Sequence, residues 1–417
     1  MTPKTDKKAF SSPLAAAKHL RASDARAVVQ LATQATRGVV RIAEGVHQSV
    51  WNTLGAPAGE KADQARGVTG MVYKSIHKVT QLLGEGADKA LARLVPLLST
   101  VESAPAESPQ REAVLAALNG VMGDHLAESG NPFATSMSLR LQGKTLDWSA
   151  PPAKSAVTGK VLVLIHGLCM NDLQWGRQYG DALASELGYT PVYVRYNTGL
   201  HTSQNGAELS RQLEELAKHW PVKVKELTVL SHSMGGLVTR SALHQAQQDR
   251  LIWPKSLKNI VFLGTPHHGA PLERAGNWVD VLLGATRYSA PFKKLGQLRS
   301  AGITDLRYGF VVDADWQGRD RFHRQPDNRT PIPLPGAADG VRCYTLAATT
   351  AARRSTMADR LIGDGLVPLH SALGQHTDPQ RTLVFAKDAE RILYRTSHMA
   401  LLDSPEVTQQ LLDWLGK

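Results

Sequence analysis

Hydrophobic residues in the second half of the chain occur in short continuous runs. Such runs are typical of strands buried on both faces of a parallel sheet. Between them, apolar residues recur at steps of three and four, which indicates amphipathic helices. The predicted strands are 161–165, 191–196, 227–230, 259–263, 341–347 and 382–385, and the predicted helices are 173–187, 203–219, 235–248 and one from about 404. This alternation predicts a doubly wound, mostly parallel α/β domain.

The first hundred residues carry helical patterns only, with the longest apolar stripe running from Val68 to Leu98. Through Val95 this region has 14 Lys and Arg against 7 Asp and Glu, so it holds +7 of the net charge of +11. Two interpretations are open. The region is a helical hairpin packed on the main domain, or it is an amphipathic element that binds lipid or a partner.

A Pro/Ser/Glu-rich linker follows at 99–110, then a predicted helix at 111–129 and a hairpin at 136–148. We therefore expect a helical N-terminal region (1–100), a connecting part (101–156) and a catalytic α/β domain (157–417). Residues 270–340 lack a strand pattern, and an insertion of this length predicts a cap or lid.

Composition changes this picture little. The chain has 417 residues, of which 42% are apolar and 20% charged, as in soluble globular proteins. Two distant cysteines favour a reducing compartment, and neither a signal peptide nor a membrane-spanning stretch is evident. A cytoplasmic location, or one peripheral to a membrane, is expected. No Walker loop or dinucleotide fingerprint occurs, and no nucleic-acid partner is expected.

The segment "LTVLSHSMGGLVTR" (227–240) places a small-residue turn between a strand and a helix. This is the setting of a nucleophile elbow, in which the residues two before and two after the nucleophile must be small. Centring the turn on Ser233 places Ser231 and Gly235 there, with His232 beside the nucleophile. Centring it on Ser231 places Val229 there, which is too large. Ser233 is the predicted nucleophile.

A serine nucleophile needs a base and an orienting acid, which follow it in that chain order as acid and then histidine. Asp364, in "LIGDGLVP", follows the strand predicted at 341–347. His398, in "RTSHMALL", precedes the predicted terminal helix. Rival acids are Asp359 and Asp378, and the rival histidines His370 and His376 precede the expected last strand.

The tetrahedral intermediate needs backbone amide donors. Met234 follows the nucleophile at a helix N-terminus, and Leu168 follows His166-Gly167 at the end of the first parallel strand. We expect these two amides to form the oxyanion hole, with His166 and Gly167 supporting the loop. Cys169 lacks an elbow and is interpreted as a small apolar filler.

Two other polar segments are given plainer interpretations. "GTPHHGAP" (264–271) is read as a tight loop beside the site rather than a metal site, and no metal or cofactor is expected. The Arg-rich segment 316–329 alternates in charge and is read as a solvated loop, with contact to an anionic head group as the alternative.

The segments "LIHGL", "SHSMGGLVTR", "FLGTPHHGAPL", "DGLVP" and "SHMALL" resemble, in order, those of the α/β-hydrolase family, within it bacterial lipases and esterases. The core is also similar to the hydrolase domain of GPI inositol deacylases. The resemblance covers about 157–417, and it departs from the usual motif where Ser231 replaces a glycine. It implies cofactor-free cleavage of a small-molecule or lipid ester through an acyl-enzyme. Some bacterial lipases hold a structural calcium, whose ligands cannot be placed in this sequence.

The sequence therefore predicts a serine ester hydrolase of the lipase or carboxylesterase type. A thioesterase and an intracellular polyester depolymerase use the same chemistry on other substrates. A non-catalytic protein that binds a lipid surface through an inherited hydrolase fold is the third alternative. The predicted triad argues against it.

Overall fold

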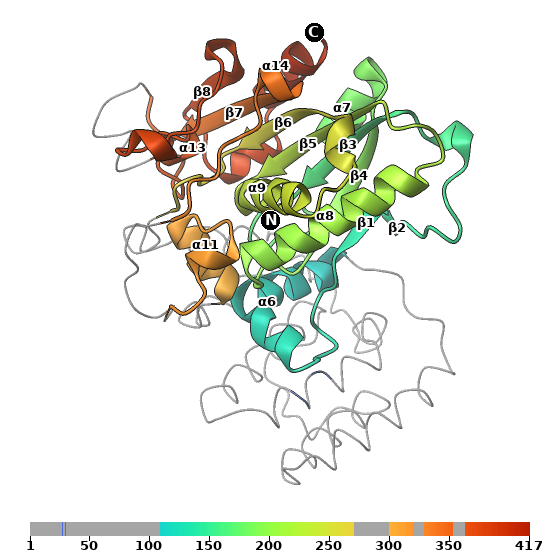
Figure 1. Ribbon diagram of the computed structural model, residues 1–417, viewed down its shortest axis with the longest axis horizontal. Coiled ribbons are helices and arrows are strands. Elements are labelled where there is room, and N and C mark those ends of the chain that lie inside the picture. The colour runs from blue at the N-terminus through green and yellow to red at the C-terminus, as the bar shows by residue number, and fades with distance from the viewer. Residues whose placement is uncertain (1–26, 28–29, 31–108, 271–299, 320–328, 353–362) are drawn as a thin grey trace, which may run out of the picture.

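The computed structural model describes residues 27, 30, 109–270, 300–319, 329–352 and 363–417 (Figure 1). In this part of the chain the strands form one eight-stranded sheet with the order β2-β1-β4-β3-β5-β6-β7-β8. The strands from β4 to β8 in this order are parallel, and the β1–β2 hairpin pairs antiparallel with β4. The bounds are β1 (Ser138–Leu141), β2 (Lys144–Thr145), β3 (Lys160–Ile165), β4 (Thr190–Arg195), β5 (Glu226–His232), β6 (Leu257–Leu263), β7 (Arg342–Thr349) and β8 (Glu390–Tyr394).

Helices cover both faces of the sheet. On one face, α7 (Gln178–Leu187) and α14 (Pro405–Leu415) pack against buried strand residues such as Leu164. On the other face, α8 (Thr202–His219) and α9 (Met234–Gln248) pack against alternate residues such as Val163. Because both sides are buried, whole strands are apolar, which explains the continuous hydrophobic runs. The predicted doubly wound α/β class is confirmed.

Most predicted elements are present, with bounds that differ by a few residues. The helix predicted at 173–187 begins only at Gln178, after a series of turns. The terminal helix begins at Pro405, and the Ser404 hydroxyl caps it by accepting from the Val407 amide.

The strand predicted at 382–385 is wrong. Leu383 and Phe385 are buried in the core, but Val384 is 84% exposed and the segment pairs with no strand of the described sheet. The last strand is instead β8, whose sequence ERILY is mostly exposed. An edge strand needs little apolar surface, so β8 carries no hydrophobic run to reveal it.

Helix α6 (Pro109–Glu128) and helix α11 (Ala301–Tyr308) lie next to each other at one side of the sheet (Figure 1). The Ser300 hydroxyl, at the start of α11, donates to the Gly120 carbonyl of α6 (2.7 Å). Helix α11 is part of the predicted 270–340 insertion, and the described residues of that insertion contain no strand. Residues 271–299 and 320–328, and the N-terminal stripe 68–98, lie outside the described residues.

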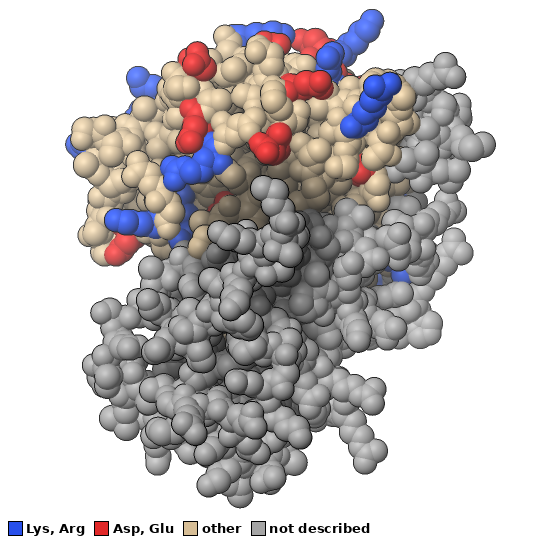
Figure 2. All heavy atoms as spheres, turned by 180° about the vertical axis from the view of Figure 1, so that it is seen from behind, with Lys and Arg blue, Asp and Glu red and all other residues tan. Residues whose placement is uncertain are grey.

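Basic and acidic side chains are interspersed on the described part of the face shown in Figure 2. A mixed surface of this kind supports solubility more than binding to a single polyanion. Among the described helices, none combines the length and apolar character needed to cross a bilayer.

Candidate active site

Ser233 lies in the turn between β5 and α9, where its backbone has φ 55° and ψ −124°. A positive φ is strained for a residue that carries a Cβ atom, and such strain is typical of a nucleophile elbow. The Ser233 amide donates to the Leu263 carbonyl (2.9 Å), which ties the turn to the end of β6. A Cβ atom at Gly235 would overlap the Ile165 carbonyl oxygen, so the backbone leaves no room for a side chain there.

Ser231 lies inside β5 and is fully buried. Its hydroxyl donates to the Val261 carbonyl of the neighbouring strand (3.2 Å). The two serines of the motif therefore lie in different surroundings, because Ser231 is engaged within the sheet and Ser233 is on the turn.

Asp364 and His398 form a direct, buried pair. The His398 Nδ1 donates to the Asp364 Oδ2 at 2.6 Å, and the His398 amide donates to the Asp364 carbonyl at 2.9 Å. The other carboxylate oxygen accepts from the amides of Leu366 (3.0 Å) and Val367 (2.8 Å). These bonds fix the carboxylate and hold the imidazole with its proton on Nδ1, which leaves Nε2 as the basic nitrogen. That Nε2 is buried and has no hydrogen-bond partner in the described part of the chain.

The elbow and the Asp364–His398 pair meet at the end of β6. A Cβ atom at Gly264, the residue after β6, would lie 3.3 Å from both the Asp364 Oδ2 and the His398 Cε1. The carbonyl of Leu263, the residue before Gly264, accepts the hydrogen bond from the Ser233 amide. On the elbow itself, the His232 Nε2 donates to the His398 carbonyl (3.2 Å), and the two rings lie 4.6 Å apart. Burial holds the pKa of His232 well below 6.5, so it is neutral beside His398.

The loop after β3 lies against the elbow. A Cβ atom at Gly167 would lie 3.0 Å from the Ser233 Cβ, so a side chain there would crowd the nucleophile turn. His166 stacks on Tyr196 with centroids 4.4 Å apart, and its Nδ1 bonds the Gly167 carbonyl (2.9 Å). Burial lowers the pKa of His166 to about 4, so it is a neutral support of the loop.

Leu168 and Met234 flank this contact and share one buried apolar cluster. No described residue accepts a hydrogen bond from either backbone amide. The assignment of these two amides to an oxyanion hole stays a prediction, which requires both N–H groups to face the Ser233 hydroxyl.

Cys169 is buried in the same cluster, and burial raises the pKa of its thiol to about 12. A thiol with so high a pKa is a weak nucleophile, in agreement with the interpretation as an apolar filler. Both cysteines, Cys169 and Cys343, are free and buried.

The rival residues lie elsewhere or have other partners. Asp378 caps a short helical turn by accepting from the Gln380 amide (3.0 Å). His370 lies in α13 (Leu369–Ala372) and is exposed. His376 packs on His268, with ring centroids 4.9 Å apart. Asp359 lies outside the described residues.

The histidines of the 264–271 loop take structural positions. His267 is buried beside Phe262, and burial lowers its pKa well below 6.5. His268 bonds the Gly374 carbonyl through Nε2 (2.9 Å), and burial lowers its pKa to about 3. Within the described residues, no group of three or more His, Cys, Asp or Glu is arranged to hold a metal ion.

Two features of the site are not evident from the sequence pattern. Gly264 belongs to a segment that the sequence predicts only as a tight loop, although its position directly after a buried strand is typical of a site of close approach. Helix α6 precedes the hydrolase segments, yet a Cβ atom at its Gly120 would overlap the Cys169 Sγ. No local signal in α6 predicts this contact, because it depends on how the chain folds back.

A family described as a domain of unknown function (DUF7379) matches residues 137–306. No curated protein matches the chain in sequence. Among solved structures, the chain is similar to a mature lipase of Bacillus licheniformis, with 18% identity, coverage of 67% of this chain and 97% of that chain, and a TM-score of 0.40. Lipase B of Aspergillus fumigatus is 11% identical, with coverage of 94% of this chain and 85% of that chain and a TM-score of 0.40. An esterase of Pyrococcus furiosus is 14% identical, with coverage of 63% of this chain and 83% of that chain and a TM-score of 0.37.

The order of strands and predicted site residues is a property of the chain's own topology. The serine turn follows β5, Asp364 follows β7, and His398 follows β8 ahead of the terminal helix. That is the chain order of nucleophile, acid and histidine in α/β-hydrolases. The described part of the chain therefore has a doubly wound, mostly parallel α/β fold in which the predicted site residues follow successive strand ends in this order.

Proposed function

We propose that this protein is a serine hydrolase that cleaves carboxylic esters through an acyl-enzyme. The observation that carries the proposal is the buried Asp364–His398 pair, 2.6 Å apart, which lies against the same end of β6 as the strained Ser233 turn. A hydroxyl on a strained turn, a histidine and an orienting carboxylate are the parts of a nucleophilic triad.

In the proposed reaction, His398 Nε2 takes the Ser233 hydroxyl proton while the oxygen attacks the ester carbonyl carbon. Asp364 holds the ring and stabilises the imidazolium that forms. The amides of Leu168 and Met234 donate to the negative oxygen of the tetrahedral intermediate. The leaving alcohol takes the proton from Nε2, and a water molecule, activated by the same nitrogen, then releases the acid.

The substrate is proposed to be a lipid ester or a smaller acyl ester, with the 270–340 insertion shaping the acyl pocket. Thioesters and polyester oligomers are alternative substrates that the same chemistry would cleave. A panel of p-nitrophenyl esters of increasing chain length, acyl thioesters and polyester oligomers, all assayed with the same preparation, ranks these classes by kcat/KM.

The two serines of the motif provide a matched test. Ser233→Ala should lower ester hydrolysis by at least about 10³-fold and abolish labelling by a fluorophosphonate. Ser231→Ala, two residues away, removes only a bond to a strand carbonyl and should keep both labelling and most of the activity. The proposal would be refuted if the fluorophosphonate labelled Ser233→Ala. It would also be refuted if the wild type neither hydrolysed esters nor reacted with the fluorophosphonate. The second outcome would favour a non-catalytic lipid-surface protein.

The basic N-terminal region is proposed to contact anionic lipid. Deleting it would be a poor test, because Ala27 is fully buried in the cluster that contains Leu168. Replacing Lys74, Lys78 and Lys89 by glutamine keeps the chain length and removes charge. Weaker sedimentation with phosphatidylserine vesicles is expected, and unchanged sedimentation would contradict this proposal.

A further inference from the structure

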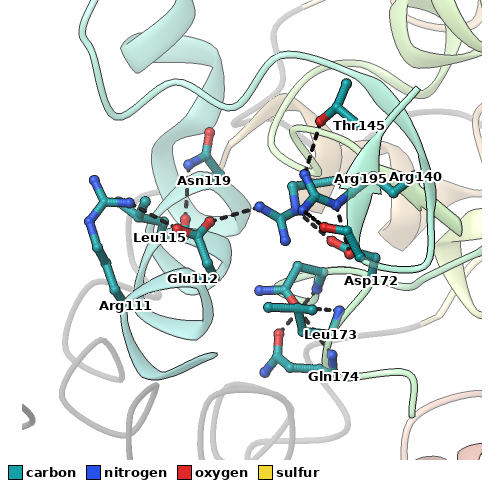
Figure 3. A network of polar contacts seen from close by, with 12 residues as sticks. Arg111, Glu112, Leu115, Asn119, Arg140, Thr145, Asp172, Leu173, Gln174 and Arg195 are labelled. Carbon is teal, nitrogen blue, oxygen red and sulfur yellow. Dashed lines mark hydrogen bonds and ion pairs between the residues drawn. The ribbon is translucent and has the colours of Figure 1, made fainter. Parts of the chain in front are cut away.

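The loop after β3 is held at its far end by a network of buried charges (Figure 3). Asp172 in this loop accepts from the Arg195 Nε (2.5 Å) and forms an ion pair with the Arg140 Nε (3.0 Å). The Arg195 Nη1 also bonds Glu112 of α6 at 3.0 Å. The four side chains Asp172, Arg140, Arg195 and Glu112, here called the Asp172 network, are each less than 10% exposed.

The network fixes the position of Asp172 more strictly than a single ion pair would. Each carboxylate oxygen of Asp172 is held by a different guanidinium, one at the end of β4 and one on β1. The planar Arg195 guanidinium donates to one oxygen in a fixed direction, whereas the Arg140 Nε holds the other by charge alone, as an ion pair without a hydrogen bond. Because the charges are buried, moving Asp172 away would take a counter-charge from two arginines that are shielded from water, which opposes displacement of the loop.

The other end of the same loop lies against the nucleophile. Gly167 abuts Ser233, and the Cys169 amide donates to the Thr198 hydroxyl (3.1 Å) with Cys169 at φ 59°. Leu168 lies between these two contacts, four residues before Asp172. The Leu168 amide is thus carried by a short segment whose two ends are anchored, one at the elbow and one in the Asp172 network.

We propose that Asp172 is a positioning residue for the Leu168 amide, and that Glu112 makes α6 part of this positioning apparatus. This rests on the proposed function. The amide donates much more strongly to the oxygen once that oxygen is negative, so a displaced loop should destabilise the transition state far more than it weakens substrate binding. A purely structural role would instead reduce the amount of folded enzyme.

The test compares Asp172→Asn with a buried carboxylate elsewhere. Glu214 of α8 is 6% exposed and accepts from the Ile252 and Trp253 amides (2.8 and 3.0 Å), and its described polar partners include no residue of the loop after β3. Glu214→Gln therefore reproduces the loss of a buried charge without affecting the oxyanion site. Each preparation is titrated to completion with a fluorophosphonate, so that rates are expressed per competent site.

For Asp172→Asn we expect kcat per titrated site to fall about tenfold or more, with KM within about twofold of wild type. The inhibition constant of an alkyl boronic acid, whose adduct with serine mimics the tetrahedral intermediate, should rise by the same factor as kcat/KM falls. Glu214→Gln should lower the melting temperature and leave both quantities per site unchanged.

If Asp172→Asn does not fold, Glu112→Gln decides, and the same pattern with a smaller loss is expected. If the variant that folds has the wild-type kcat per titrated site and the wild-type inhibition constant, this inference is overturned. The proposed function would still stand. Equal losses in Glu214→Gln would also overturn this inference. A wild type that neither hydrolyses esters nor takes up the fluorophosphonate would instead overturn the proposed function, and this inference with it.

Discussion

Gly264 provides the sharpest test of how the site is assembled. It follows β6 with φ 56°, a conformation that favours glycine, and its Cα faces the Asp364–His398 pair. In Gly264→Ala, the new Cβ would lie 2.8 Å from the Leu401 Cδ1 and 3.3 Å from both the Asp364 Oδ2 and the His398 Cε1. The variant should therefore lose both stability and activity.

The magnitude has two parts. Placing a Cβ atom in the left-handed region costs about 1–2 kcal/mol. Overpacking a buried site costs a further 1–3 kcal/mol or so, and Leu401 is fully buried and cannot move into solvent. The free energy of unfolding should fall by roughly 2–5 kcal/mol. Because the pair is displaced by the same contact, kcat should fall about tenfold or more.

Gly188 is the matched control. It caps α7 with φ 73°, and a Cβ atom there would have no neighbour within 4 Å. Gly188→Ala thus carries the backbone cost alone, about 1–2 kcal/mol, and should keep full activity. Urea unfolding and p-nitrophenyl ester kinetics per titrated site measure both variants. Equal effects of the two substitutions on stability and on kcat would refute the argument from packing.

Three further outcomes are expected. Asp364→Asn should lower kcat on the order of 10⁴-fold with an unchanged circular dichroism spectrum, as the loss of a triad carboxylate does; a loss below tenfold would contradict its role. Burial lowers the pKa of His268 in the folded state to about 3, below its unfolded value, so the free energy of unfolding falls as the pH drops from about 6.5 towards 3. In His268→Gln, the slope of the free energy of unfolding against pH, measured with urea, should decrease by about 1.4 kcal/mol per pH unit. An unchanged slope would contradict this. Gly120→Ala should lower the free energy of unfolding by about 1–3 kcal/mol, although alanine favours helices, because its Cβ atom would overlap the Cys169 Sγ. In a double-mutant cycle, Cys169→Ala should restore part of that loss. Additive effects would mean that the two residues do not touch.

The order of strands and helices could be predicted because burial on both faces of a parallel sheet leaves a strong signal in the sequence. The apolar runs of β3 and β5 are of this kind, and their predicted positions agree with the structure. Edge strand β8 could not be predicted in this way, because one mostly exposed strand needs few apolar residues. Leu383 and Phe385 misled the prediction because a loop can also bury alternate side chains.

The sequence by itself also singled out the residues of the candidate site. The need for small residues around an elbow separates Ser233 from Ser231, and the order of acid and histidine selects Asp364 and His398. These are local constraints of a turn and of chain order, which a linear sequence can express.

Only the tertiary structure decided how these residues are held. The bond between His398 and Asp364, the close approach of Gly264 and the Asp172 network join segments that are 23 or more positions apart. Arg195 and Glu112, for example, are separated by 83 positions and meet only because α6 packs beside the end of β4. A buried charge leaves no periodic pattern, since its partner is set by the packing of the whole domain and not by its neighbours in sequence.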